Sequence, residues 1–243
     1  MNHYKAIYLA LGLALAAPAI AQTIGTGPKP TPTSAKDWPG KGYASAYPLW
    51  VERRAEFWVD CEKDQGAVVF FGDSITHGWT GVGKAFPALK VANRGIGSDT
   101  SKGLLWRLQE DVLDLHPRAV VMLIGINDIA SGVSPSDVAG NIRAMVDQMH
   151  KANPKMPVIL CKVMPWKVVP GKSPGRVMQL NALIEGIAIG RPQVAVCDTW
   201  TPFATPENVC RKEEFPDLLH PNEAGHTIWA AALKPVMEKM GIL

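Results

Sequence analysis

Low net charge and a shortage of paired cysteines exclude several classes of protein. The formal net charge is +3 over 243 residues, too small to indicate a nucleic-acid partner or a membrane surface. None of the four cysteines belongs to a Cys-x-x-Cys pair, so the spacing typical of a zinc site is absent and we expect no metal. After the N-terminal region, no stretch approaches the roughly 18 apolar residues of a membrane-spanning helix. The length and the 47% of hydrophobic residues fit one sizeable globular domain.

Three motifs that would indicate other functions are incomplete. The stretch 78–84 has the glycine and lysine spacing of a phosphate loop, but Ala85 stands where the magnesium-binding Ser or Thr belongs. Gly95-Ile96-Gly97 begins like a dinucleotide-binding turn, but Thr100 replaces the third glycine. No predicted strand runs directly into a Gly-x-Ser-x-Gly nucleophile elbow. We therefore expect that the protein binds no cofactor. We also expect that it is not an α/β-hydrolase of the usual kind.

Residues 1–21 differ in composition from the rest of the chain. Lys5 precedes an apolar stretch over 7–17, and small residues occupy the two cleavage positions in Ala19-Ile20-Ala21. This pattern predicts a cleavable signal peptide, too short to span a membrane, and hence a periplasmic or extracellular protein. Residues 22–47, rich in Pro, Gly, Thr and Ser, are expected to form an N-terminal arm ahead of a domain over 48–243.

Export would make the four cysteines potential disulfide partners, with three possible connectivities. A bond between Cys197 and Cys210 would close the loop after the last predicted strand. Cys161 and Cys197 lie within predicted strands, where buried free thiols are equally normal. The pattern leaves both alternatives open.

Short apolar runs alternate with helical patterns along the rest of the chain. Five of these runs are typical of buried strands: 67–71, 89–93, 119–124, 157–163 and 193–197. Their alternation with helices predicts an α/β fold, a three-layer α/β/α sandwich around a five-stranded parallel sheet. Right-handed crossovers with helices on both faces favour a doubly wound, flavodoxin-like strand order.

Two polar motifs follow strands of this predicted sheet. The first apolar run ends in Gly72-Asp73-Ser74, so Ser74 lies beyond the carboxyl end of a strand, where catalytic groups of parallel sheets gather. The same three residues are also a common turn. Asp217 and His220 lie three residues apart in a loop that enters the last helix. A carboxylate there would hold one imidazole nitrogen and leave the other free as a base toward a serine.

Four blocks of sequence resemble, in order, those of the SGNH (GDSL) hydrolases. They are Gly72-Asp73-Ser74, residues 95–100, Gly125-Ile126-Asn127-Asp128 and Asp217-Leu218-Leu219-His220-Pro221. The stretches Asn93-Arg94-Gly95-Ile96-Gly97 and Leu105-Trp106-Arg107-Leu108 further resemble the branch that contains platelet-activating-factor acetylhydrolase catalytic subunits and secreted acetylesterases. The resemblance runs from about residue 68 to the final helix and implies the SGNH hydrolase fold.

The resemblance also implies a role for each matched residue. Ser74 would be the nucleophile, His220 the general base and acid, and Asp217 the residue that orients His220. The backbone N–H of Ser74, the backbone N–H of Ser98 and the side chain of Asn127 would hold the oxyanion. Ser98 stands where the family usually has glycine. Its N–H survives that change, but a positive φ would strain a serine.

Tryptophans leave two of the predicted strands close to the same edge of the sheet. Trp166 follows Pro165, and Trp200 lies two residues before Pro202, so a neighbouring proline limits the backbone freedom of each. Either ring could offer a flat face to a sugar. The alternative is that both cover the core.

These features together predict an exported carboxylic ester hydrolase that works through an acyl-enzyme. Small acyl groups, acetyl first, on a carbohydrate are the expected substrates, a preference that rests on export and on the resemblance. A lysophospholipase or thioesterase is the nearest alternative. A secreted glycan-binding module without turnover is the alternative from another class, but binding alone would not require His220 beside Asp217.

Overall fold

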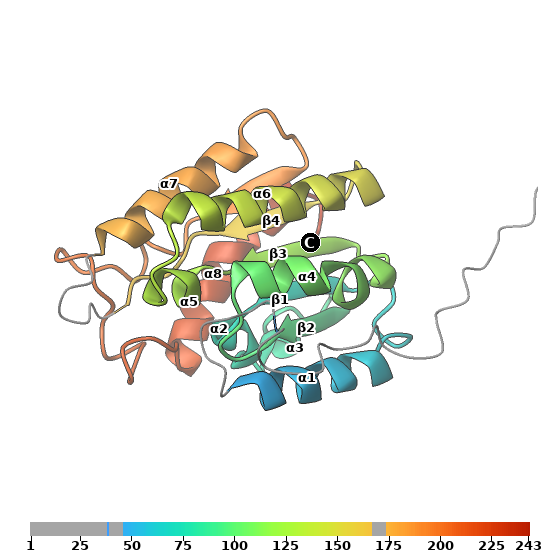
Figure 1. The fold of residues 1–243 in the computed structure, drawn as a ribbon, viewed down its shortest axis with the longest axis horizontal. Helices are drawn as coiled ribbons and strands as arrows, with labels where there is room; N and C mark the ends of the chain where they lie inside the picture. The colour runs from blue at the N-terminus through green and yellow to red at the C-terminus, as the bar shows by residue number, and fades with distance from the viewer. Residues whose placement is uncertain (1–37, 39–45, 167–173) are drawn as a thin grey trace, which may run out of the picture.

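The computed structural model describes residues 38, 46–166 and 174–243 (Figure 1). The predicted signal peptide over 1–21 and all but Trp38, Ala46 and Tyr47 of the predicted arm lie outside the described residues. Within the described ranges, no helix is long and apolar enough to cross a bilayer.

The centre of the fold is a five-stranded sheet in which every pairing is parallel. Its strands are β1 (Val68–Gly72), β2 (Val91–Gly95), β3 (Ala119–Leu123), β4 (Val158–Cys161) and β5 (Val194–Cys197). They lie in the order β2-β1-β3-β4-β5, which is the predicted flavodoxin-like order. β1 and β3 are buried along their whole length, as expected for strands covered on both faces.

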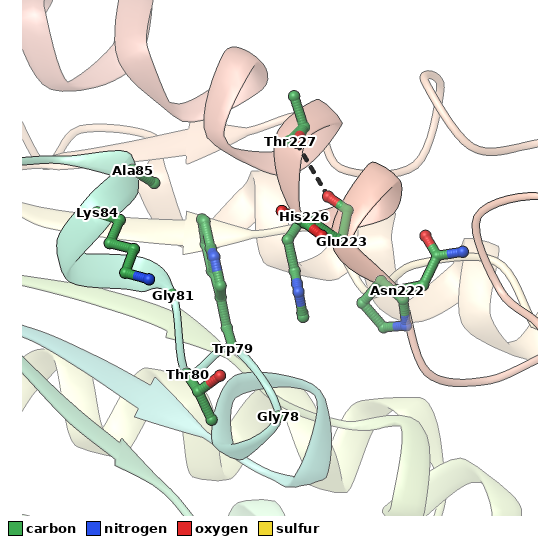
Figure 2. A pocket seen from close by; sticks show the side chains of 11 residues that line it. Gly78, Trp79, Thr80, Gly81, Lys84, Ala85, Asn222, Glu223, His226 and Thr227 are labelled. Carbon is green, nitrogen blue, oxygen red and sulfur yellow. Dashed lines mark hydrogen bonds between the residues drawn. The ribbon is translucent and has the colours of Figure 1, made fainter.

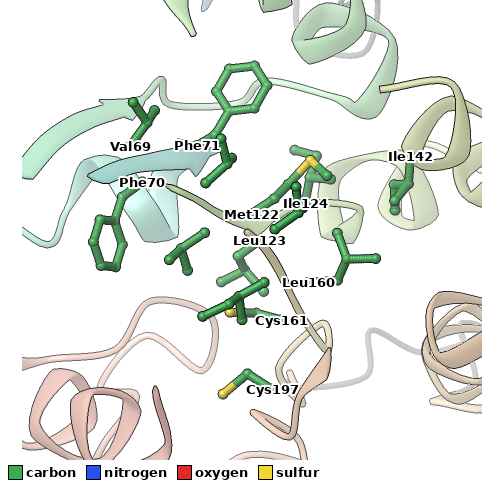
Figure 3. Close-up of a cluster of buried hydrophobic side chains, with 14 of the residues drawn as sticks. Val69, Phe70, Phe71, Met122, Leu123, Ile124, Ile142, Leu160, Cys161 and Cys197 are labelled. Atoms are coloured by element: carbon green, nitrogen blue, oxygen red, sulfur yellow. The ribbon is translucent and has the colours of Figure 1, made fainter. Parts of the chain in front are cut away.

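Helices connect consecutive strands and cover the sheet (Figure 1). They are α1 (Tyr47–Val59), α2 (Ser74–His77), α3 (Val82–Ala85), α4 (Ser101–Asp111), α5 (Ile126–Ala130), α6 (Pro135–Ala152), α7 (Gly175–Ala188) and α8 (Glu223–Lys239). A 3₁₀ turn, η2 (Leu113–Leu115), precedes β3. The main core forms where apolar side chains of the sheet meet these helices (Figure 3).

Two neighbouring phenylalanines show which helices cover which face. Phe70 and Phe71 point to opposite sides of β1 (Figure 3). The Phe70 ring lies 5.6 Å from Trp79, which packs on Trp229 of α8 with ring centroids 4.5 Å apart. The Phe71 ring lies 4.6 Å from the guanidinium carbon of Arg107 on α4. α8 and α4 therefore cover opposite faces, which confirms the three-layer sandwich.

The second strand begins two residues later than predicted. β2 spans Val91–Gly95 rather than 89–93, because Leu89 is held in the turn that follows α3. Arg94 is able to lie in a buried strand since its guanidinium pairs with the Asp64 carboxylate at 2.8 Å. The other four strands lie within two residues of their predicted bounds.

The predicted arm contributes one tryptophan to a second, smaller core. Trp38 is fully buried and packs on Trp50 of α1 with ring centroids 6.1 Å apart. Phe57 and Ile96 complete this cluster. Burial of so large an aromatic surface is strongly favourable, so Trp38 belongs with the folded domain, whose predicted start was residue 48.

All four cysteines are free, so of the two alternatives the structure has free thiols and not a disulfide between Cys197 and Cys210. Cys197 lies in β5, where it pairs in register with Cys161 of β4. Cys210 instead donates its thiol to the carbonyl oxygen of Leu218 at 3.3 Å. The strand residue and the loop residue are thus held by different partners.

Candidate active site

Ser74 is presented by a sharp turn between β1 and α2. The Asp73 carboxylate caps α2 by accepting the Ile75 backbone N–H at 3.0 Å, and side chains of this type are preferred at that position. A Cβ at Gly72 would lie 2.5 Å from the carbonyl oxygen of Leu123, so only glycine fits. The turn leaves the Ser74 side chain half-buried at the carboxyl edge of the sheet.

His220 reaches Ser74 from the loop that precedes α8. Its Nε2 lies 2.9 Å from Ser74 Oγ, and its Nδ1 lies 2.6 Å from Asp217 Oδ2. Asp217 Oδ1 also accepts the backbone N–H of His220 at 2.7 Å. Leu218, between the two, has a left-handed φ of 65°. Such strain persists only where surrounding contacts enforce it, and it is common at functional sites.

The Asp217 carboxylate is held in its charged form. Burial alone would raise its pKa, but hydrogen bonds from the His220 backbone and imidazole and from the Leu219 backbone outweigh burial and lower the pKa. A charged carboxylate at Nδ1 keeps the proton of the imidazole on that nitrogen. Nε2 is then the basic nitrogen facing Ser74.

Ser98 and Asn127 come from the loops after β2 and β3. Ser98 has a φ of 63°, the left-handed conformation in which glycine carries no steric cost. The Asn127 side-chain amide donates to the Asp99 carbonyl oxygen at 2.9 Å, and an amide has a second N–H to offer. In the described residues, the backbone N–H groups of Ser74 and Ser98 have no acceptor. These donors suit an anion beside Ser74.

Arg107 of α4 joins the segments that carry Ser74 and Ser98. The sequence analysis missed this role. Its side chain is 0% exposed. Nε pairs with Asp99 Oδ2 at 2.8 Å, while Nη2 donates to the carbonyl oxygens of Gly72 at 3.1 Å and Arg94 at 2.9 Å. In the sequence, Arg107 stood out only as part of the block Leu105-Trp106-Arg107-Leu108, which gave it no role of its own.

Three buried carboxylates surround these loops. Asp128 accepts the backbone N–H and the hydroxyl of Ser101, at 2.9 Å and 2.7 Å. Burial raises the pKa of Asp99, although Arg107 opposes the rise. Burial, with smaller contributions from Asp99 and Asp128, raises the pKa of Asp73 to about 7. Asp73 and Asp128 thus satisfy backbone N–H groups where α2 and α4 begin. No cluster of three or more metal-ligating side chains occurs in the part of the chain that the structure describes.

The tryptophans differ from the expected arrangement. Trp166 is only 7% exposed and packs in the main core, which supports the alternative that its ring covers the core over the prediction that it faces a sugar. Trp200 is half-buried, and its backbone N–H donates to Asp198 Oδ1 at 3.0 Å. Trp200 therefore remains a candidate.

The parallel sheet between helix layers, with a serine, an imidazole and a carboxylate joined by hydrogen bonds, is typical of hydrolases that cleave ester bonds. The chain belongs to the GDSL-like Lipase/Acylhydrolase family, whose model matches residues 70–228. This confirms the family that the four sequence blocks predicted.

Known relatives cover most of the chain. Platelet-activating factor acetylhydrolase IB subunit alpha1 of Rattus norvegicus is 26% identical over 220 residues, 89% of this chain and 91% of that protein. A GDSL-like lipase structure from Bacteroides thetaiotaomicron is 30% identical, has a TM-score of 0.67, and covers 78% of this chain and 97% of its own. Axe2, an acetylxylan esterase from Geobacillus stearothermophilus, shares the fold with a TM-score of 0.58 at 23% identity, over 73% of this chain and 95% of its own.

Proposed function

We propose that this protein is an exported serine esterase that removes acetyl and other short acyl groups from carbohydrates. The observation that carries the proposal is the unbroken series from Ser74 Oγ to His220 Nε2 at 2.9 Å and from His220 Nδ1 to Asp217 at 2.6 Å. A serine hydroxyl is a weak nucleophile unless a base oriented in this way activates it. Export rests on the signal-peptide pattern of residues 1–21.

Acylation follows from these positions. Ser74 Oγ attacks the ester carbonyl carbon while His220 Nε2 accepts the hydroxyl proton. Asp217 stabilises the imidazolium that forms. The negative oxygen of the tetrahedral intermediate lies near the N–H groups of Ser74 and Ser98 and the amide of Asn127. His220 then gives its proton to the leaving alcohol, the carbon–oxygen bond breaks, and the acyl group stays on Ser74.

Deacylation repeats these steps with water in place of the serine. His220 Nε2 takes a proton from water, and the resulting oxygen nucleophile attacks the acyl carbon. The same donors hold the second oxyanion. Collapse returns the proton to Ser74 Oγ and releases the carboxylic acid. Each proton taken up by His220 is given back, so the enzyme ends in its starting state.

Support for acetyl comes from the curated relatives, which are named acetylhydrolases. Support for a carbohydrate comes from the predicted export. Axe2 adds that the same fold occurs in an acetylxylan esterase. A lysophospholipase or thioesterase would instead need an apolar channel for a long acyl chain, so chain-length preference separates the candidates.

The test is hydrolysis of p-nitrophenyl esters of graded acyl length by the purified protein. We expect acetate to be the best substrate and Ser74→Ala to lose turnover. Asn127→Ala should lower kcat by about 10²–10³ with little change in KM, the usual effect of losing one oxyanion donor. A preference for long acyl chains would favour the lysophospholipase or thioesterase, and full activity in Ser74→Ala would remove the proposal.

A further inference from the structure

A cleft of about 570 Å³ lies between the segment that follows α2 and the start of α8, and none of the residues assigned above lines it. Two segments form it, residues 78–85 after α2 and residues 221–227 at the start of α8 (Figure 2). The side chains that give it chemical character are Trp79, Thr80, Lys84, Asn222, Glu223 and His226. We infer that this cleft binds the sugar that leaves as the alcohol when the ester is cleaved.

Both walls of the cleft connect directly to the reacting groups. Gly78, in the first wall, donates its backbone N–H to the carbonyl oxygen of Ser74 at 2.8 Å. Pro221, in the second wall, follows His220. Gly78 comes four positions after Ser74, which in a helical turn is about 6 Å along the axis. A sugar in the cleft therefore lies within reach of an ester bond held at Ser74.

The cleft also lies on the side of the sheet that the leaving group requires. Trp79 packs on Trp229 of α8 at 4.5 Å, so the cleft is on the α8 face. The Ser98–Asn127 loops are tied to Arg107 of α4, on the opposite face, through Asp99. The oxyanion donors of these loops are therefore anchored from the α4 face. The alcohol oxygen must lie beside His220 to receive its proton, and so points toward α8.

The charges of the cleft favour a neutral, hydroxyl-rich ligand. Lys84 supplies one cation and Glu223 one anion, and neither has an ion pair or a side-chain hydrogen bond elsewhere in the described residues. Burial lowers the pKa of His226, which keeps this imidazole neutral. The charges therefore balance. An ammonium donor, a carboxylate acceptor and the Thr80 hydroxyl match the donors and acceptors of a sugar ring.

The same cleft fits a phospholipid alcohol poorly. Trp79 is only 3% exposed, and the His226 ring is stacked against it with centroids 5.3 Å apart and planes 4° from parallel. No open aromatic face remains there for a quaternary ammonium group. Thr80, Lys84 and Glu223 are exposed polar side chains, so this wall offers little surface to an alkyl chain. A sugar is the ligand that the wall favours.

This inference rests on the proposed function, because only an esterase releases an alcohol. The experiment compares Lys84→Met and Glu223→Gln with Lys234→Met and Glu238→Gln, matched exposed positions farther along α8. Losing a charged hydrogen bond should reduce kcat/KM on an acetylated xylo-oligosaccharide about tenfold or more in the two cleft variants. Their kcat/KM on p-nitrophenyl acetate should stay within about twofold of the wild type, because the nitrophenyl leaving group carries none of the ring hydroxyls that Lys84 and Glu223 would bind. The control variants should change neither value.

Binding without turnover separates failure of this inference from failure of the esterase proposal. Deacetylated xylo-oligosaccharide should bind to Ser74→Ala protein in a calorimeter, and more weakly when Lys84→Met is added. Unchanged oligosaccharide kinetics and binding in the cleft variants would overturn the sugar subsite while leaving the esterase intact. So would a wild type that cleaves p-nitrophenyl acetate but no acetylated sugar, or cleft variants that lose activity selectively on an acetylated phosphocholine lipid. If the wild-type protein shows no activity on small esters, the proposal that it is an esterase is contradicted.

Discussion

Arg107 Nη2 donates a 3.1 Å hydrogen bond to the carbonyl oxygen of Gly72, two residues before the serine that faces His220. The same guanidinium holds Asp99, one residue after Ser98. One fully buried side chain thus links the loop of the nucleophile to the loop of an oxyanion donor. Arg107 touches no substrate in this account and acts as a positioning residue.

Arg107→Lys should keep the buried charge but lose the fork that reaches Gly72, Arg94 and Asp99 together. We expect kcat on p-nitrophenyl acetate to fall about tenfold or more, with KM nearly unchanged, because misplacement by a fraction of an ångström is costly in an active site. Arg143→Lys, an exposed site on α6, is the control.

Arg107→Met should destabilise the protein more than Arg107→Lys, since it leaves the buried Asp99 carboxylate without its cation. Breaking a buried ion pair typically costs about 3–5 kcal/mol of stability, so thermal melting should shift strongly. The lysine variant is the one that tests the positioning role, because it keeps the buried positive charge. If Arg107→Lys lowers the melting temperature but leaves kcat unchanged, the residue is structural only.

Ser98→Gly should retain activity or increase it. The backbone N–H is kept, and glycine adopts the observed φ of 63° without the steric cost that a serine bears. Ser98→Ala is the matched control, because it removes the hydroxyl and keeps the left-handed strain. The measurement is steady-state kinetics of the wild type, Ser98→Gly and Ser98→Ala. A large loss of kcat in both variants would show that the hydroxyl itself takes part.

Asp73→Asn should stabilise the protein increasingly as pH rises. Burial raises the pKa of Asp73 to about 7, from 3.8 for an ordinary Asp. Below about pH 4 both folded and unfolded chains hold the proton, so Asp73 carries no penalty. Between about pH 4 and 7 the unfolded chain ionises first, and folding stability falls as pH rises. Asparagine does not ionise and removes that fall.

The measurement for Asp73→Asn is urea unfolding at several pH values from 4 upward. The difference in unfolding free energy between variant and wild type should grow up to about pH 7 and then level off. The exposed Glu207→Gln provides the comparison. A difference that is constant with pH, or that shrinks as pH rises, would show that Asp73 does not carry a raised pKa.

Trp200→Ala tests the remaining aromatic candidate for sugar contact. If the half-buried Trp200 ring meets the sugar, kcat/KM falls on an acetylated oligosaccharide and stays unchanged on p-nitrophenyl acetate. Trp166→Ala should instead lower the melting temperature and both activities together, because its ring is buried in the core. Equal declines for both substrates in Trp200→Ala would assign Trp200 to the core as well.

The fold was predictable because buried parallel strands produce continuous apolar runs, and the site because polar residues follow those runs. Either a strand end or a family block in the sequence indicated each of the main site residues, which are Ser74, Asn127, Asp217 and His220. Arg107 was not predictable in its role, since a buried arginine on an apolar helical stripe shows nothing of the two strand ends and the loop that its guanidinium contacts. The burial of Trp166 depends on packing between distant segments, so the local sequence around Pro165 does not predict it.

The cleft beside His220 was equally invisible in the sequence. Its walls, residues 78–85 and 221–227, are about 140 residues apart along the chain and meet only through the packing of Trp79 against α8. In the sequence, residues 78–84 show only an incomplete phosphate-loop motif. In the folded chain Lys84 lines the same cleft as the carboxylate of Glu223 and the imidazole of His226.

The most direct test of the central claim is labelling with an organophosphonate that reacts with activated serines. Mass spectrometry should find one adduct per chain, located on Ser74, and the adduct should form at the same rate as esterase activity is lost. His220→Ala should slow this labelling severely, because the unassisted hydroxyl is a weak nucleophile. Complete loss of activity with Ser74 unmodified, or full modification of Ser74 with activity retained, would contradict the account.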